Sequence, residues 1–207
     1  MSDDGSEAEG EAAPTIGTYT GTRDATGQRS GSDCSNIFPN GDVYKGGYVS
    51  GVRGETGTYT WKKPLAVYSG GYKDGKRDGE GKFVYPDASV YVGHFANGKR
   101  HGEGRYTYVN GDTYSGHWKD DVRHGKGVYT VASSGSKLEG TWSNGILNGQ
   151  SKIIHQDHVV KTNFADGQPG LPASITFTST AYTMQLGERD KVFLGRGTAV
   201  AAGGDGE

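Results

Sequence analysis

Aromatic residues and glycines recur along the chain with two spacings at once. Over a short stretch they alternate, so that Tyr68, Gly70 and Tyr72 share one face of an extended segment while Ser69 and Gly71 fall on the other. The whole arrangement then returns about every 23 residues. Its tyrosine position is occupied in turn by Tyr19, Tyr44, Tyr68, Tyr91, Tyr114, Leu138 and Val160. The short period indicates β-strands, and the long period indicates about seven stacked units with degenerate ends.

Each unit is predicted to contain two strands joined by a turn. A second alternating set follows at Gly81, Phe83 and Tyr85, and residues 74–79 before it carry the Asp, Gly and Lys side chains of a turn. Further turn segments join the units, at residues 39–42, 86–88 and 110–112. The sequence therefore predicts an all-β fold, an elongated antiparallel β-meander of stacked hairpins that forms a curled single-layer sheet.

The predicted core is thin, because no segment has the helical period needed to cover the aromatic side of the sheet. A bare glycine such as Gly93 or Gly116 leaves room for a ring from an adjacent strand or unit to lie flat. The expected repeat-core positions are Tyr44, Gly46, Tyr48, Tyr68, Gly70, Tyr72, Tyr91, Gly93, Phe95, Tyr114, Gly116, Trp118, Gly140 and Trp142. Roughly fourteen strands about 4.8 Å apart would span about 65 Å, so we expect an elongated molecule.

Four regions follow from the extent of the repeats. Residues 1–15 are acidic and nearly free of apolar side chains, which predicts a disordered N-terminus. Residues 16–167 hold the repeat array. Residues 168–190 predict a C-terminal strand or extended arm, and residues 191–207 predict a flexible tail.

Composition agrees with a thin core, since 37 of 207 residues are glycine and only 32% are hydrophobic. The net charge of -2 gives no bulk attraction to nucleic acid or acidic membranes, so we expect neither as a general partner. Cys34 is the only cysteine, which excludes an intramolecular disulfide and fits a reducing compartment. No apolar run is long enough for a signal peptide or a membrane span. We therefore expect a cytoplasmic protein.

Candidate chemistry is weak, and we expect no enzyme activity, no cofactor and no metal site. The segment 70–76 has the glycine and lysine spacing of a phosphate loop, but Arg77 follows where Ser or Thr belongs, and no helix is predicted. His101 and His124 occupy the same position of successive units. Two strands per unit would separate them by about 10 Å, which is too far to share one ion.

The unit resembles the MORN repeat, whose pattern is Tyr-x-Gly-x-aromatic, a Gly-Lys-x-His-Gly-x-Gly turn and alternating aromatics. The resemblance covers roughly residues 19–167, and its best copy reads Tyr91 to Phe95, then Gly98 to Gly104. It implies a scaffold or docking module.

The flanking segments narrow this resemblance. Residues 16–23, 135–142 and 154–158 are similar to the MORN-repeat subunits of the ciliary radial spoke head. That resemblance implies a non-catalytic scaffold of the cytoskeleton in the axoneme of a cilium or flagellum, where it supports motility. The implied partners are other radial spoke head proteins and projections of the central apparatus, together with a second copy or a paralogue.

Two features are candidate partner-binding surfaces. The first is a row of arginines, each nine residues after the tyrosine of its unit: Arg53, Arg77, Arg100 and Arg123. Stacking should align them along one edge, facing an acidic protein or a phospholipid. Because Glu80 and Glu103 lie three residues beyond two of them, a solvated and locally neutralised turn is the competing interpretation. The row also supports an alternative function, a MORN membrane adaptor that binds phosphoinositides.

The second candidate is the aromatic side of the sheet, which nothing in the chain is expected to cover fully. Its members are Tyr72, Tyr85, Phe95, Tyr108 and Trp118. Such a strip is a core first, and a partner could also grip it, because exposed aromatic patches mark interfaces.

Overall fold

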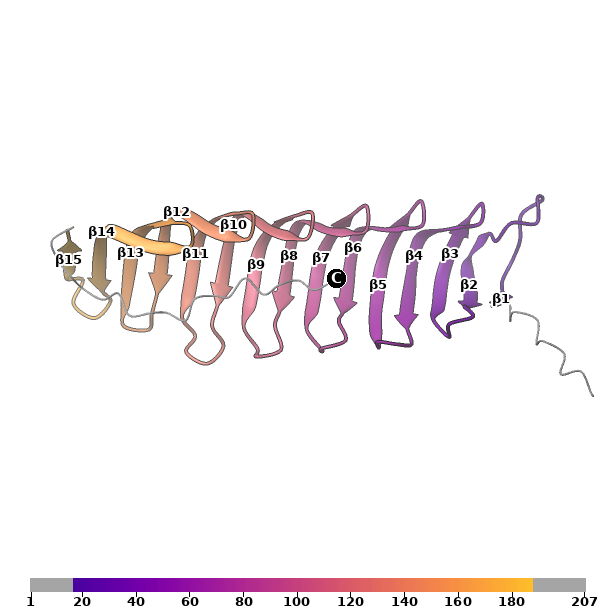
Figure 1. The fold of residues 1–207 in the computed structure, drawn as a ribbon, viewed down its shortest axis with the longest axis horizontal. Coiled ribbons are helices and arrows are strands. Elements are labelled where there is room, and N and C mark those ends of the chain that lie inside the picture. The colour runs from indigo at the N-terminus through magenta and orange to yellow at the C-terminus, as the bar shows by residue number, and fades with distance from the viewer. Residues whose placement is uncertain (1–16, 188–207) are drawn as a thin grey trace, which may run out of the picture.

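The computed structural model describes residues 17–187, in which fifteen strands form one antiparallel sheet in strict chain order (Figure 1). The strands are β1 (Thr18–Thr20), β2 (Gly31–Ile37), β3 (Val43–Val49), β4 (Val52–Trp61), β5 (Ala66–Lys73), β6 (Lys76–Val84), β7 (Val90–Ala96), β8 (Lys99–Thr107), β9 (Thr113–Lys119), β10 (Val122–Thr130), β11 (Lys137–Ser143), β12 (Ile146–Ile154), β13 (His158–Ala165), β14 (Gln168–Phe177) and β15 (Thr183–Leu186). The predicted all-β meander is confirmed.

The sheet is open and elongated, with the strands side by side along its long axis (Figure 1). β14 and β15 fall in the stretch predicted as a C-terminal strand or arm, and both continue the meander. The predictions for residues 1–15 and 191–207 lie outside the described residues.

Each repeat hairpin closes with a two-residue turn. Asp74 and Gly75 have φ angles of 51° and 77°, and Asn97 and Gly98 have 51° and 86°. Two positive φ angles in succession define a type I′ turn, which matches the twist of paired strands and favours Asn or Asp before Gly. The turn is shorter than the predicted stretch 74–79, because β6 already begins at Lys76.

A β-bulge interrupts each hairpin from β3–β4 to β9–β10 beside its paired glycines. In the hairpin of β7 and β8, Gly93 pairs with Gly104 and Phe95 pairs with Arg100, so one residue of β7 faces three of β8. The middle residue of the three, Gly102, has a φ of 62°, in the left-handed region that glycine tolerates. Glu55 holds the same position in the hairpin of β3 and β4, with a φ of 60°.

The core is a layer of rings lying against the paired glycines. Tyr91 has no exposed surface, and its hydroxyl donates to the carbonyl oxygen of His94 at 3.0 Å. Its ring covers Gly104, where an added Cβ would lie 2.5 Å from the ring atom Cζ. At Gly93 an added Cβ would instead meet the backbone of β8, with the Glu103 carbonyl oxygen at 2.6 Å. The space for the ring is therefore at Gly104, whereas Gly93 permits close approach of two backbones.

The same arrangement recurs from unit to unit. Tyr44, Tyr68 and Tyr114 are also fully buried, and each hydroxyl donates to a carbonyl oxygen three residues later. Neighbouring rings meet edge to face, as between Tyr91 and Trp118 at a centroid distance of 5.4 Å and an interplanar angle of 84°. Each such pair contributes about 0.5–1.5 kcal/mol beyond area burial. These contacts join successive hairpins into one continuous core.

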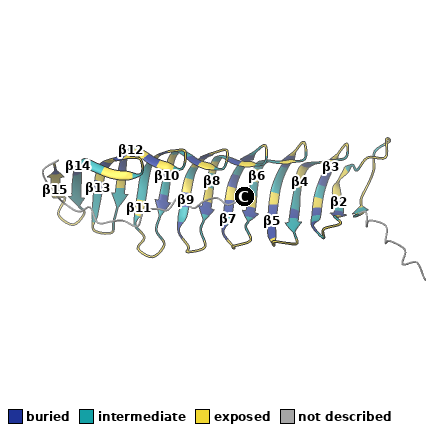
Figure 2. Cartoon of the chain, in the orientation of Figure 1, coloured by how far each residue is buried: buried dark blue, intermediate teal, exposed yellow. Residues whose placement is uncertain are grey.

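The tyrosine–glycine arrangement ends near β11. Leu138 and Val160 take the tyrosine position, and a second small cluster is formed by Val160, Ala173 and Leu186. Burial alternates along much of the sheet, as in β7 and β9 (Figure 2), so the sheet has an aromatic face and a polar face.

Candidate docking surfaces

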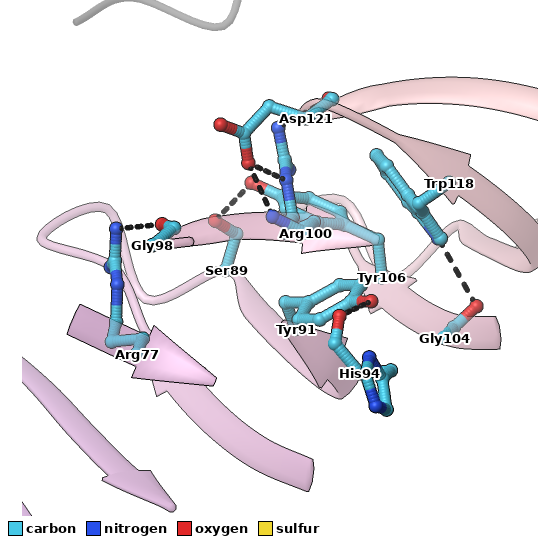
Figure 3. A network of polar contacts seen from close by, with 10 residues as sticks. All are labelled: Arg77, Ser89, Tyr91, His94, Gly98, Arg100, Gly104, Tyr106, Trp118 and Asp121. Carbon is cyan, nitrogen blue, oxygen red and sulfur yellow. Dashed lines mark hydrogen bonds and ion pairs between the residues drawn. The ribbon is translucent and has the colours of Figure 1, made fainter. Parts of the chain in front are cut away.

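The arginine row connects each unit to the next. Arg53 donates to the carbonyl oxygen of Gly75 at 3.1 Å, and Arg77 donates to that of Gly98 at 2.5 Å (Figure 3). Arg123 reaches the carbonyl oxygen of Gly145 in the same way, at 3.0 Å. Each acceptor belongs to the two-residue turn of the following hairpin. The four arginines are therefore aligned along the sheet, and their guanidinium groups link each hairpin to the turn of the next.

Arg100 makes the fullest set of these contacts. Its Nη2 donates to the Asp121 carbonyl oxygen at 2.8 Å, and its Nε lies 3.1 Å from the carboxylate of the same residue (Figure 3). The paired carboxylate thus comes from the next turn. Glu103, expected to neutralise this arginine, instead lies 3.8 Å from His117.

The guanidinium groups also cover the aromatic face. Arg100 lies 4.6 Å from the Trp118 ring centroid, and Arg123 lies 4.4 Å from that of Trp142. Both arginines are less than a tenth exposed, at 4% and 8%. Cation–π contacts that are shielded from water contribute about 2 kcal/mol each. These side chains stabilise the array, and little of either guanidinium is open to a ligand.

The aromatic strip is more closed than the sequence suggested. Tyr72, Phe95 and Trp118 are buried by neighbouring rings and by the arginines, so the expectation that nothing in the chain covers them fully is wrong. Tyr85 and Tyr108 are half-buried at the rim of the same face. Partner binding by these five residues stays a prediction.

The connections between units hold buried carboxylates that the sequence identified only as turn residues. Asp112 accepts hydrogen bonds from the Tyr129 hydroxyl at 2.6 Å and from the Ala132 backbone nitrogen at 2.8 Å. Burial alone would raise the pKa of this carboxyl, but hydrogen bonds from Tyr129, Ala132 and Asn110 outweigh it and lower the pKa. Asp42 pairs with Tyr59 in the same way, at 2.9 Å. These contacts fix the turns on the strands.

The polar face carries one continuous central row. Cross-strand pairing connects Thr20, Ser35, Lys45, Thr58, Ser69, Lys82, Val92, Arg105, Ser115, Val128, Glu139, Lys152, Lys161, Ser174 and Gln185. Every strand contributes one side chain. Alternation along each strand is the sequence signal for this row, since its members lie one residue away from the aromatic and glycine positions.

The C-terminal part of the polar face is hollowed. An open depression of about 960 Å³ crosses β10 to β15. Its polar-face lining is Lys126, Val128, Glu139, Thr141, Gln150, Lys152, Lys161, Asn163, Pro172, Ser174 and Gln185. A smaller depression of about 310 Å³ lies beside Trp118 and includes His101, His117 and His124.

A model of the MORN repeat family matches residues 44–63, 68–90, 91–113, 114–135 and 139–150. The chain belongs to the MORN-repeat family. The matched segments lie within the predicted range 19–167, and the sheet extends beyond them at both ends. This MORN chain is 36% identical over 67 residues to MORN repeat-containing protein 3 of Xenopus laevis. The alignment covers 32% of this chain and 28% of the relative, so it spans less than a third of that protein.

Among solved structures, the MORN sheet is similar to the SAS-4 (dCPAP) TCP domain of Drosophila melanogaster, which was solved in complex with a proline-rich motif of Ana2 (dSTIL). The TM-score is 0.51 at 12% identity, covering 86% of this chain and 94% of that domain. At this identity the likeness concerns the fold alone.

Within residues 17–187, no helix is long and apolar enough to cross a membrane. The same part of the chain contains no group of three or more His, Cys, Asp or Glu side chains arranged to hold a metal ion.

Proposed function

We propose that this MORN-repeat chain is a non-catalytic scaffold of the ciliary or flagellar radial spoke head, docking other spoke-head proteins in the axoneme and supporting motility. Family membership supports a repeat scaffold. The axonemal setting rests on the similarity of residues 16–23, 135–142 and 154–158 to spoke-head subunits.

The observation that carries the docking role is the continuous central row on the polar face. One side chain from each strand follows the central row at a spacing of about 4.8 Å, which offers a partner a long and regular surface. The ring contacts and the arginine contacts hold successive hairpins in fixed register behind it. A rigid sheet can orient several partners, because binding then costs little conformational entropy in the scaffold.

The solved domain of similar fold adds a precedent for peptide docking. That domain holds a proline-rich motif, and its likeness to this chain covers most of both sheets. We infer that the docking surface here is the polar face, since the arginines and rings already fill the aromatic face.

The phosphoinositide alternative loses its main support. It required an arginine row open to lipid phosphates, whereas Arg53, Arg77 and Arg123 donate to turn carbonyls and stack on rings. Liposome pelleting over a range of salt concentrations tests this alternative directly. Charge-driven attachment would be strong at low salt and would weaken as salt rises.

Cross-linking of isolated axonemes from cells expressing a tagged full-length chain tests the proposed function. We expect lysine-directed cross-links from the polar face, including Lys82 and Lys152, to other spoke-head proteins. Absence of the chain from axonemes, or recovery with lipid alone, would refute the proposal.

A further inference from the structure

The hollow over β10 to β15 has an excess of positive charge. Three lysine side chains, Lys126, Lys152 and Lys161, are exposed along its lining, against one carboxylate, Glu139. Within residues 17–187 no carboxylate lies within 4.0 Å of any of the three amines. Lys152 and Lys161 are direct cross-strand partners, so two like charges face each other across the floor of the hollow. Such a pair is destabilising unless an anion lies between them.

The N-terminal half of the same face is balanced differently. Lys82 has Glu80 two residues away on the same strand, and Arg105 has Glu103 at the same spacing. Residues two apart on a strand share a face, so these basic residues have acidic neighbours. In the hollow, Lys152 has such a neighbour in Glu139, its direct cross-strand partner. Lys126 and Lys161 have no carboxylate two residues away on their own strands, and none among their cross-strand partners.

The shape of the hollow suits an extended chain. Six strands at about 4.8 Å spacing span about 24 Å, which accommodates about seven extended residues. Side-chain amides at Gln150, Asn163 and Gln185 supply donors and acceptors along the lining. Ile154 and Val159 are cross-strand partners that lie beside Lys152 and Lys161, on the side of the inter-unit turns. Both side chains are half-buried and apolar, so they can contact apolar side chains of a bound peptide.

We propose that this hollow binds an extended acidic peptide segment of a partner protein, with its carboxylates between Lys126, Lys152 and Lys161. Glu139 stands in the same row and would repel a uniform polyanion such as nucleic acid. Glu139 favours a peptide that places a neutral or basic residue opposite it. The site therefore selects both the charge of the peptide and its alignment along the hollow. The inference rests on the proposed docking role, but not on the axonemal setting.

Fluorescence anisotropy with the full-length chain tests this proposal. The probe is a fluorescein-labelled peptide of alternating Glu and Ser, about ten residues long so that it exceeds the hollow. The matched probe replaces Glu by Gln. We expect binding of the Glu peptide alone, with affinity that falls as salt rises.

The variant Lys152→Ser with Lys161→Ser should weaken binding about tenfold, since it removes two exposed charges from the site. The control variant, Lys45→Ser with Lys82→Ser, changes the same row outside the hollow and should leave affinity within about twofold. Thermal melts should show all three proteins folded, because these side chains are exposed, and Lys152→Ser with Lys161→Ser should melt no lower than the wild type, because it removes a pair of like charges.

Three results would overturn the proposal: failure of the wild-type chain to bind the Glu peptide, equal binding of the Gln peptide, or equal loss in both lysine variants. A fourth concerns the acidic side chains of residues 1–12. If replacing them by Ser in the full-length chain raises peptide affinity several-fold, the occupant is the N-terminus of this chain and not a partner. Peptide binding that fails while spoke-head cross-links persist refutes this inference and leaves the proposed function intact.

Discussion

Gly104→Ala should be among the most damaging small substitutions in the array. An alanine Cβ would lie 2.5 Å from Cζ of Tyr91, a ring with no exposed surface and therefore no empty space to enter. Accommodating the methyl group requires the ring to tilt away from the sheet. Overpacking of this kind costs about 1–3 kcal/mol.

Tilting the ring has further costs. The Tyr91 hydroxyl would lose its hydrogen bond to the His94 carbonyl oxygen, at about 0.5–1.5 kcal/mol. The edge-to-face contacts with Phe95 and Trp118 would weaken, at up to about 1 kcal/mol each. We therefore expect a total loss of about 3 kcal/mol, equivalent to a fall in melting temperature of about 6–12 °C for a chain of this size.

Circular dichroism melts and urea titrations of the full-length chain measure this loss. The control is Ser115→Ala, an exposed change on the polar face that should stay within about 0.5 kcal/mol. Tyr91→Leu combined with Gly104→Ala gives a double-mutant cycle. Because a smaller side chain relieves the clash, the double variant should lose less than the sum of the two single losses. A melting temperature for Gly104→Ala equal to that of the control would refute the reasoning, as would strict additivity in the cycle.

Three other predictions follow from the same architecture. Gly93→Val should cost about 1–3 kcal/mol, because its side chain meets the backbone of β8, whereas Ser115→Val should change little; equal thermal shifts would contradict the assigned faces. Glu55→Gly should stabilise the chain by about 1 kcal/mol in urea titrations, since Glu55 holds a φ of 60° that glycine adopts without strain; a lower midpoint would count against this. Burial raises the pKa of Tyr68 and Tyr85 to about 12, so their stabilisation is complete below the unfolded value near 10 and is lost as pH rises through about 12. Tyrosinate absorbance from the core should then appear together with loss of β-sheet circular dichroism, and ionisation well before unfolding would show that the rings are accessible.

Much of the fold could be predicted because its signals are local. Alternation at Tyr68, Gly70 and Tyr72 sets the strand period, and an Asn-Gly or Asp-Gly pair sets the hairpin turn. The turn was predicted too long because Lys76 and Arg77 have the polarity of turn residues although they lie in β6.

The destination of the arginines could not be predicted from spacing alone. The bulge in each hairpin sets two extra residues of the second strand against the first, which brings Arg100 opposite Phe95 on the aromatic face. Spacing alone predicts a row along one edge, without the bulge that turns these side chains onto the aromatic face. The hollow could not be predicted from the sequence either. Alternation shows that Lys152 and Lys161 lie on the polar face, but the depression depends on how six strands are arranged in space.

The arginine hydrogen bonds described above run from each unit to the turn of the unit that follows. Since each of these hydrogen bonds joins a unit to the turn of its immediate neighbour, an additional copy of residues 91–113 could be inserted with the same contacts on both sides. Each such copy would lengthen the sheet by two strand spacings, about 10 Å. The number of repeats therefore sets the length of the sheet, and with it the distance at which two partners docked on the same face would be held.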